Sequence, residues 1–307
     1  MSAAGAARPW LIAHRGCSGE RPEHTRSAYE RAIAQGADLL EPDLVVSRDG
    51  VLIVRHENAL SETTDVASHP EFAARRTTKS VDGRPHEDWF AEDFTLDELK
   101  TLRCRERLPE LRGTAHDGRE PILTFDELLT IAETAGVGLV VELKHAADFR
   151  RQGLDLEPRA ADATAQARVP ILFESFEPGA LDRLAELSPH PRVQLVDAQG
   201  APFDRPGQPY AEMLTDHGLD ALARRVQGVS VAKALLTRDL ADRAHKRGLQ
   251  VFAWTYRAEN VFLPSDLWRG DDPAAYGRMD EELRRARAME VDGLFCDFPG
   301  LARQALD

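Results

Sequence analysis

The chain has 307 residues, of which 42% are hydrophobic and 30% are charged, and its formal net charge is −13. This length and composition are typical of a globular protein with a sizeable core. The acidic balance argues against electrostatic binding to nucleic acid or anionic membranes. No apolar run approaches the roughly 18 residues of a membrane helix, so we expect no stable membrane insertion. Residues 1–9 show no signal-peptide pattern, which predicts a cytoplasmic protein, or a secreted or periplasmic one if a signal has been removed.

Short apolar runs alternate with amphipathic helical patterns along the chain. The runs predicted to be strands lie at residues 10–13, 38–45, 51–55, 138–143, 170–174, 192–196, 228–231, 249–255 and 293–296. Thr25 is the expected cap of a helix that ends near Gly36, and capping boxes of the form Thr-x-x-Glu begin at Thr95 and Thr124. This alternation predicts a parallel sheet with helices outside it.

We predict an α/β fold, a closed (β/α)₈ TIM barrel that forms a single catalytic domain over residues 1–307. An open doubly wound sheet is less favoured, because no glycine-rich phosphate loop follows the first strand. A barrel has eight strand positions, so one predicted strand must lie outside it, either 51–55 or 192–196. Residues 57–120 are polar and poor in strand pattern. We interpret them as an insertion with one or two helices.

Chemistry-bearing side chains stand at the ends of four predicted strands. These residues are His14, Glu41, Asp43, His56, Glu142 and Lys144. The ends of parallel barrel strands meet at one mouth, so we expect the six side chains to converge. Three carboxylates at close range repel one another unless a cation lies among them, and an all-oxygen set suits Mg²⁺ or Ca²⁺ rather than zinc. The sequence therefore predicts one divalent cation, Ca²⁺ or Mg²⁺, with two histidines left for proton transfer.

Other residues near strand ends carry weaker predictions. Arg15 and Lys144 are expected to neutralise a phosphodiester together with the metal. Trp254 either packs in the core or forms a wall against a glycerol or sugar backbone. Asp297 is expected to turn the chain after the last strand, and His24 to shape a loop before a helix.

These motifs resemble, in order and spacing, those of the glycerophosphodiester phosphodiesterase family. The matching segments are 12–16 (Ile-Ala-His-Arg-Gly), 22–25 (Pro-Glu-His-Thr), 41–43 (Glu-Pro-Asp), 142–144 (Glu-Leu-Lys), 254–255 (Trp-Thr) and 297–299 (Asp-Phe-Pro). The resemblance covers nearly the whole chain and is strongest to the bacterial broad-specificity, often secreted branch. Two positions depart from the family pattern: Glu57 stands where Asp is usual, and Glu62 stands where Arg is frequent.

The resemblance implies a TIM barrel and a role for each site residue. Glu41, Asp43 and Glu142 would be the metal ligands, and His14 and His56 the acid–base pair. Arg15 and Lys144 would contact phosphate. The implied reaction is metal-dependent hydrolysis of small-molecule glycerophosphodiesters to glycerol 3-phosphate and an alcohol. It would proceed through a cyclic phosphate that water then opens.

Three alternatives remain open at this point. A phospholipase-type phosphodiesterase would act on intact lipid. A Schiff-base aldolase would use Lys144, because such lysines also stand at barrel strand ends. A binding protein for glycerophosphodiesters would perform no turnover. The sequence makes no prediction about oligomeric state.

Overall fold

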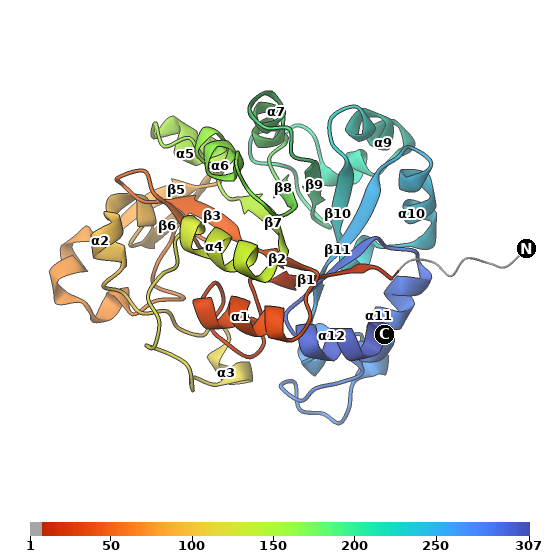
Figure 1. Ribbon diagram of the computed structural model, residues 1–307, viewed down its shortest axis with the longest axis horizontal. Helices are drawn as coiled ribbons and strands as arrows, with labels where there is room; N and C mark the ends of the chain where they lie inside the picture. Colours follow the sequence, from red (N-terminus) through yellow and green to blue (C-terminus); the bar gives the residue numbers. More distant parts are fainter. Residues whose placement is uncertain (1–7) are drawn as a thin grey trace, which may run out of the picture.

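The computed structural model describes residues 8–307, which form a closed parallel barrel surrounded by helices (Figure 1). Residues 1–7, which carry most of the segment read for a signal peptide, lie outside the described residues. The barrel strands are β1 (Trp10–His14), β2 (Leu39–Glu41), β3 (Asp43–Val46), β7 (Gly138–Leu143), β8 (Ile171–Ser175), β9 (Arg192–Val196), β10 (Gly228–Ala232), β11 (Gln250–Tyr256) and β12 (Gly293–Cys296). The predicted (β/α)₈ barrel is confirmed.

Two of these strands share one barrel position. Pro42 interrupts the predicted run 38–45, because proline has no N–H to donate, and both β2 and β3 pair with β7. The predicted strand 51–55 is β4 (Leu52–Val54), which pairs antiparallel with β3 and is not one of the parallel barrel strands. The other candidate for the outer position, Arg192–Val196, is the barrel strand between β8 and β10.

Helices follow the barrel strands, as predicted. They are α1 (Arg26–Ala34), α4 (Phe125–Ala135), α5 (Ala146–Arg151), α6 (Leu156–Thr164), α7 (Pro178–Leu187), α8 (Tyr210–Met213), α9 (Asp216–Ala223), α10 (Arg238–His245), α11 (Met279–Ala288) and α12 (Pro299–Leu306). The predicted caps are confirmed. Thr25 accepts a hydrogen bond from the backbone N–H of Ala28, and Thr124 forms a capping box with Glu127.

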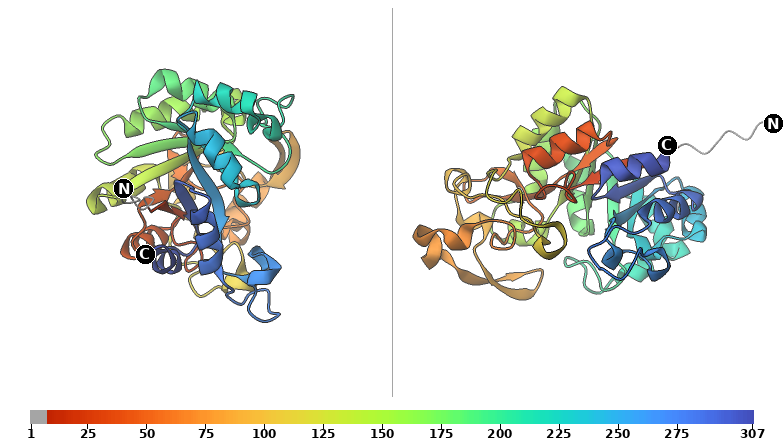
Figure 2. Two further views of the ribbon diagram at one scale, coloured as in Figure 1. Left: turned by 90° about the vertical axis from the view of Figure 1, so that its right-hand side faces the viewer. Right: turned by 90° about the horizontal axis from the view of Figure 1, so that it is seen from below.

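The insertion, residues 57–120, lies beside the barrel and extends away from it (Figure 2). It contains α2 (Leu96–Leu99), α3 (Pro109–Arg112), the short 3₁₀ turns η1 (Val66–Ser68), η2 (Pro70–Arg75) and η3 (Ala91–Asp93), and a hairpin of β5 (Thr77–Val81) and β6 (Arg84–Asp88). This hairpin was not predicted from the sequence. Its residues are almost all polar and exposed, so they lack the alternation by which a half-buried strand is recognised.

An apolar layer fills the barrel interior beneath the carboxyl ends of the strands. It consists of Ile12, Leu39, Val140, Leu172, Val193, Phe252 and Phe295. Two residues after each of these positions stands a polar or aromatic side chain, except on β9, where Leu195 follows Val193; examples are His14 after Ile12 and Glu142 after Val140. Because side chains two apart on a strand point the same way, this second layer also faces the barrel axis.

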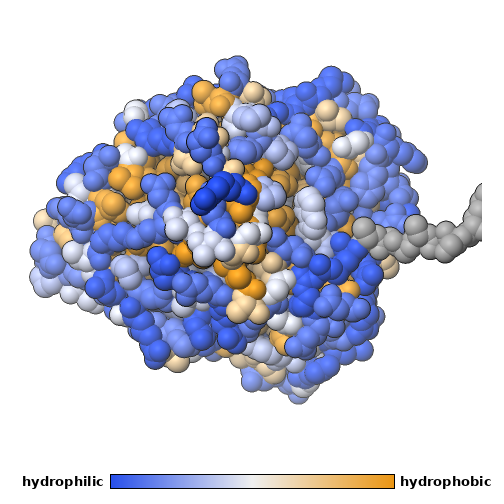
Figure 3. Space-filling model, viewed as in Figure 1, coloured by the Kyte–Doolittle hydropathy of each residue, from blue (hydrophilic) through white to orange (hydrophobic). Residues whose placement is uncertain are grey.

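Hydrophilic side chains dominate the face shown in Figure 3, with apolar residues visible between them. Among residues 8–307, no helix combines the length and apolarity that crossing a bilayer requires.

Phe252 gives a direct test of the interior packing. Its side chain is almost completely buried, and glycines at 228 and 293 leave room for the ring, since a Cβ on Gly293 would lie 2.7 Å from it. Phe252→Ala should lower the free energy of unfolding by about 3–5 kcal/mol through lost burial and a cavity. Urea denaturation measures this loss. The half-exposed Leu187 supplies the control, since Leu187→Ala should change the value by less than about 0.5 kcal/mol. A loss for Phe252→Ala as small as this control would contradict the packing.

Candidate active site

A pocket of about 1040 Å³ opens at the carboxyl ends of the barrel strands. One part of its wall carries His14, Glu41, His56 and Glu142, and another part carries aromatic residues that include Phe176. This volume lies at the upper end of small-molecule pockets. The mouth of the barrel therefore gathers the predicted residues, as the strand-end positions indicated.

Three of the predicted carboxylates form one cluster. Oxygen atoms of Glu41, Asp43 and Glu142 all lie within 4.8 Å of one another, and the three residues are at most 6% exposed. The backbone explains their proximity, because Asp43 is in register with Glu142 across β3 and β7. Burial and the Asp43 charge raise the pKa of Glu142 to about 8, although Lys144 opposes the shift. Burial, Asp43 and Glu174 raise the pKa of Glu41.

Two cations lie against this cluster. Lys144 Nζ is 2.7 Å from Glu142 Oε1 and 3.1 Å from Asp43 Oδ1. The Arg15 guanidinium is 3.4 Å from Asp43 Oδ2, and the Arg15 backbone N–H donates to Glu41 Oε2 at 2.7 Å. Although burial alone would raise the pKa of Asp43, Lys144, His56, His24 and Arg15 hold it well below its usual value.

A fourth carboxylate, Glu174, also lies in this pocket and was not predicted. It is in register with Glu142 across β7 and β8, is 1% exposed, and follows the interior residue Leu172 by two positions. Burial, Glu142 and Asp43 raise its pKa well above the usual range. Its Oε2 has no hydrogen-bond partner among residues 8–307. The same strand-end rule that singled out Glu142 could have identified it.

The residues fit a hard divalent cation. The ligand set is all oxygen, and Asp43 Oδ1 is a buried atom without a hydrogen-bond partner of good geometry in the described part of the chain. The raised pKa values of Glu41 and Glu142 mean that the metal-free cluster retains protons that a cation can displace.

His14 lines the pocket and is held from behind by Asp297. Its Nδ1 lies 2.7 Å from Asp297 Oδ1. Burial and the Arg15 charge lower the pKa of His14 to about 4. Although burial would raise the pKa of Asp297, Arg257 and Arg112 keep it well below its usual value. Asp297 lies at the turn between β12 and α12, as expected, and its carboxylate in addition orients the His14 ring.

His56 has a comparable partner in its sequence neighbour. Its Nδ1 contacts the Glu57 carboxylate, whose pKa is lowered by His56 and Arg107 despite burial. Burial, followed by Arg15 and Lys144, lowers the pKa of His56 to about 3. Both predicted histidines thus line the same pocket, each with a carboxylate at Nδ1.

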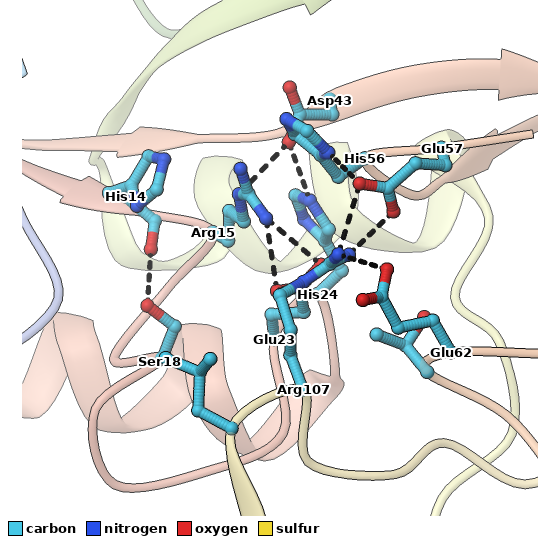
Figure 4. A network of polar contacts seen from close by, with 12 residues as sticks. His14, Arg15, Ser18, Glu23, His24, Asp43, His56, Glu57, Glu62 and Arg107 are labelled. Carbon is cyan, nitrogen blue, oxygen red and sulfur yellow. Dashed lines mark hydrogen bonds and ion pairs between the residues drawn. The ribbon is translucent and has the colours of Figure 1, made fainter. Parts of the chain in front are cut away.

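His24 lies in the loop before α1, as expected, and in addition contacts the carboxylate cluster. Its Nε2 lies 2.8 Å from Asp43 Oδ2 (Figure 4). Its Nδ1 lies 2.7 Å from the Tyr29 hydroxyl. The Tyr29 hydroxyl donates to the carbonyl of Glu41 at 3.2 Å. This buried chain fixes the orientation of Asp43, and nothing in the local sequence around His24 shows the pairing.

Trp254 lies half-buried on the pocket wall and also packs against the apolar layer of the barrel interior, so it combines the pocket position with the core packing that the sequence offered as alternatives. Its ring meets Phe176 edge to face with centroids 5.6 Å apart. Lys144 Nζ lies 5.7 Å from the centroid of the same Phe176 ring. The aromatic pair gives the pocket an apolar side next to its charged side.

Comparison with known proteins shows the family. The chain matches the glycerophosphoryl diester phosphodiesterase family over residues 14–301. It is 37% identical to glycerophosphodiester phosphodiesterase GDPD6 of Arabidopsis thaliana, over 95% of this chain and 84% of that protein. A glycerophosphodiester phosphodiesterase of Bacillus altitudinis is 22% identical, over 95% and 96% of the two chains.

A solved structure shares the fold. It is an Oleispira antarctica phosphodiesterase in complex with the product sn-glycerol-3-phosphate, with a TM-score of 0.69 and 22% identity over 98% of this chain and 97% of that one. Together with the family match, this supports the barrel found here. The chain is an enzyme that belongs to the glycerophosphoryl diester phosphodiesterase family.

Proposed function

We propose that this enzyme hydrolyses glycerophosphodiesters to sn-glycerol 3-phosphate and an alcohol, with a divalent cation and two histidines. The observation that carries the proposal is the convergence of His14 and His56 on one pocket with the Glu41, Asp43 and Glu142 cluster. The names of the curated relatives support the substrate class, and the glycerol phosphate bound in the Oleispira antarctica enzyme supports the product. We also propose that barrel and insertion, residues 1–307, act as one catalytic domain.

Glu41, Asp43 and Glu142 would hold the cation, which is Mg²⁺ or Ca²⁺ on ligand chemistry. When bound, such an ion supplies Lewis-acid polarisation of a phosphoryl oxygen and lowers the pKa of a bound hydroxyl. Arg15 and Lys144 would bind the phosphate oxygens, since both carry fixed positive charge at the edge of the cluster. Trp254 would form the apolar wall against the glycerol carbons.

The histidines would move the protons. One neutral imidazole takes the proton from the glycerol 2-hydroxyl as that oxygen attacks phosphorus. The other, protonated, gives its proton to the departing alcohol oxygen as the old P–O bond breaks. Water then opens the cyclic phosphate with the roles reversed. Each transfer contributes about 10²–10⁴-fold to the rate.

The aldolase alternative finds no support in the geometry. Burial lowers the pKa of Lys144, but the Asp43 and Glu142 carboxylates outweigh it and raise the pKa above the usual value. A Schiff-base lysine needs the opposite shift, because only the neutral amine attacks a carbonyl.

A panel of glycerophosphodiesters, assayed for released sn-glycerol 3-phosphate, tests the proposed reaction. The wild-type enzyme should turn over several diesters with Mg²⁺ or Ca²⁺ and lose activity in EDTA. His14→Gln and His56→Gln should each lower kcat by about 10²–10⁴-fold, because glutamine keeps polarity but cannot exchange a proton. His217→Gln, at an exposed position on α9, is the matched control and should leave kcat unchanged.

Full turnover in either histidine variant would contradict the acid–base assignment. Absence of turnover on every diester, with metal present, would contradict the proposed reaction itself. An intact phospholipid in the same panel distinguishes the phospholipase alternative.

Cation binding should strengthen as pH rises. The pKa of Glu142 is raised to about 8, so at pH 6 the metal-free carboxyl holds a proton that a cation must displace, whereas at pH 8 about half of it is already ionised. We expect the apparent Kd for Mg²⁺ or Ca²⁺, from calorimetry or thermal shift, to be at least about tenfold lower at pH 8 than at pH 6. Glu41→Gln should abolish binding, and Glu177→Gln, a buried pocket glutamate outside the cluster, should preserve it. A pH-independent Kd would contradict the proton exchange.

A further inference from the structure

Two arginines of the insertion stand behind the two pocket histidines. Arg112 Nη2 donates to Asp297 Oδ2 at 2.7 Å, while Asp297 Oδ1 lies 2.7 Å from His14 Nδ1. Arg107 donates through Nη1 and Nη2 to both carboxylate oxygens of Glu57, at 3.0 and 2.5 Å, and Glu57 contacts His56 Nδ1. Each histidine thus begins the same series of imidazole, carboxylate and guanidinium.

Both arginine side chains are held by several further hydrogen-bond acceptors. The Arg112 side chain is 7% exposed, and its other donors reach Glu259 Oε1 at 2.7 Å and the Ser18 carbonyl at 3.0 Å. Arg107 makes a second bidentate pair, with both oxygens of Glu23 at 2.7 Å, and reaches Glu62 Oε2 at 2.7 Å (Figure 4). A guanidinium with several fixed acceptors holds each carboxylate in one orientation.

A short segment of the insertion carries both groups. The two residues are five apart: Arg107 precedes α3 (Pro109–Arg112), and Arg112 is its last residue. Each also contacts the loop after β1, through Glu23 or Ser18. The segment is anchored by backbone bonds from Arg105 to the Thr63 carbonyl at 2.9 Å and from Glu106 to the Asp117 carboxylate at 2.8 Å. One rigid piece of chain therefore reaches behind both histidines.

The two departures from the family motif meet at one of these arginines. Glu57 and Glu62, which replace the usual Asp and the frequent Arg, both accept from Arg107. The guanidinium thus lies among the Glu23, Glu57 and Glu62 carboxylates, whose charges would otherwise repel one another. In this chain the insertion therefore supplies the cation that pairs with Glu57.

Carboxylates that stay ionised can only accept hydrogen bonds. Asp297 and Glu57 therefore oblige Nδ1 of His14 and of His56 to carry its proton, which leaves Nε2 of each ring as the nitrogen available to substrate. A ring free to rotate or to change tautomer would present the wrong atom. Partners of this kind, one step removed from the reacting groups, typically contribute about 10- to 100-fold to activity.

We propose that Arg107 and Arg112 are positioning residues that fix the tautomer and orientation of the two proton-transfer histidines, so that the insertion completes the active site. The inference rests on the proposed function, because it presupposes that His14 and His56 exchange protons with the substrate. It assigns Arg112 to His14 and Arg107 to His56.

Steady-state kinetics on two substrates test the proposal. One is glycerophosphocholine, whose leaving alcohol requires protonation, and the other is glycerophospho-p-nitrophenol, whose leaving group departs as the anion. Arg107→Gln and Arg112→Gln should each lower kcat on glycerophosphocholine about 10- to 100-fold with KM changed less than about threefold. The histidine that protonates the leaving alcohol is not needed for the nitrophenyl diester. The variant of that histidine, His56→Gln or His14→Gln, should therefore recover activity on this substrate. The glutamine variant of the arginine behind the same histidine should recover as well, with kcat within about threefold of wild type.

Arg75→Gln is the matched control. Arg75 also belongs to the insertion and pairs with a carboxylate, Glu98, but has no contact with either histidine series, so kcat should not change. Arg107→Lys and Arg112→Lys keep the charge without the bidentate fork, so their kcat should be higher than that of the glutamine variants. This difference would show that the loss in the glutamine variants does not come from misfolding. Circular dichroism verifies the fold of every variant.

Unchanged kcat in both arginine variants, while the histidine variants are inactive, would overturn this proposal and leave the proposed function intact. Equal losses on both substrates in both variants, without restoration by lysine, would also overturn it, because that pattern belongs to a purely structural role. A wild-type enzyme inactive on both diesters would instead contradict the proposed function.

Discussion

Repulsion among buried carboxylates is the constraint around which the mouth of this barrel is organised. At the separation of the Glu41, Asp43 and Glu142 oxygens, each pair of full charges repels by about 3–4 kcal/mol at an effective dielectric constant of about 20. Glu174 adds a fourth carboxyl, and Arg15 and Lys144 supply only two positive charges. The metal-free protein relieves the repulsion by retaining protons, as the raised pKa values of Glu41 and Glu142 show. Carboxyl groups that stay protonated because of this repulsion are well suited to exchange their protons for a cation.

The barrel geometry accounts for what the sequence could predict. Polar residues at the ends of apolar strands were predicted to meet at one mouth, and this located His14, Glu41 and Glu142 without a structure. The structure adds that each follows an interior side chain by two positions and so faces the axis. Glu174 obeys the same rule but was not predicted. The rule depends only on strand parity, so it is as strong for Glu174 as for Glu142.

Pairings between distant segments lay beyond sequence reasoning. Asp297 and His14 are 283 residues apart, and only the closure of β12 against β1 brings them together. His24 is close to the site in sequence, yet its contact with Asp43 depends on its own backbone conformation in the loop, where its φ is positive at 59°. The β5–β6 hairpin escaped prediction for a different reason, since its strands bury almost nothing and so carry no hydrophobic pattern.

The predicted insertion is more closely tied to the barrel than its polar composition indicated. The tip of its hairpin contacts the loop after β7, where Asp82 lies 2.8 Å from His145 Nδ1 and its backbone N–H donates to Asp148 at 2.8 Å. Arg107 and Arg112 join it to the loop after β1 and to the end of β12. The barrel strands thus supply the groups that face the pocket, and the insertion packs around them.

A diffraction experiment on calcium-soaked crystals is the most direct test of the cation site among Glu41, Asp43 and Glu142. We expect one anomalous peak, with oxygens of Glu41, Asp43 and Glu142 at about 2.3–2.6 Å from the peak. An enzyme that is active with calcium but shows no peak among these three carboxylates would contradict the proposed cation site.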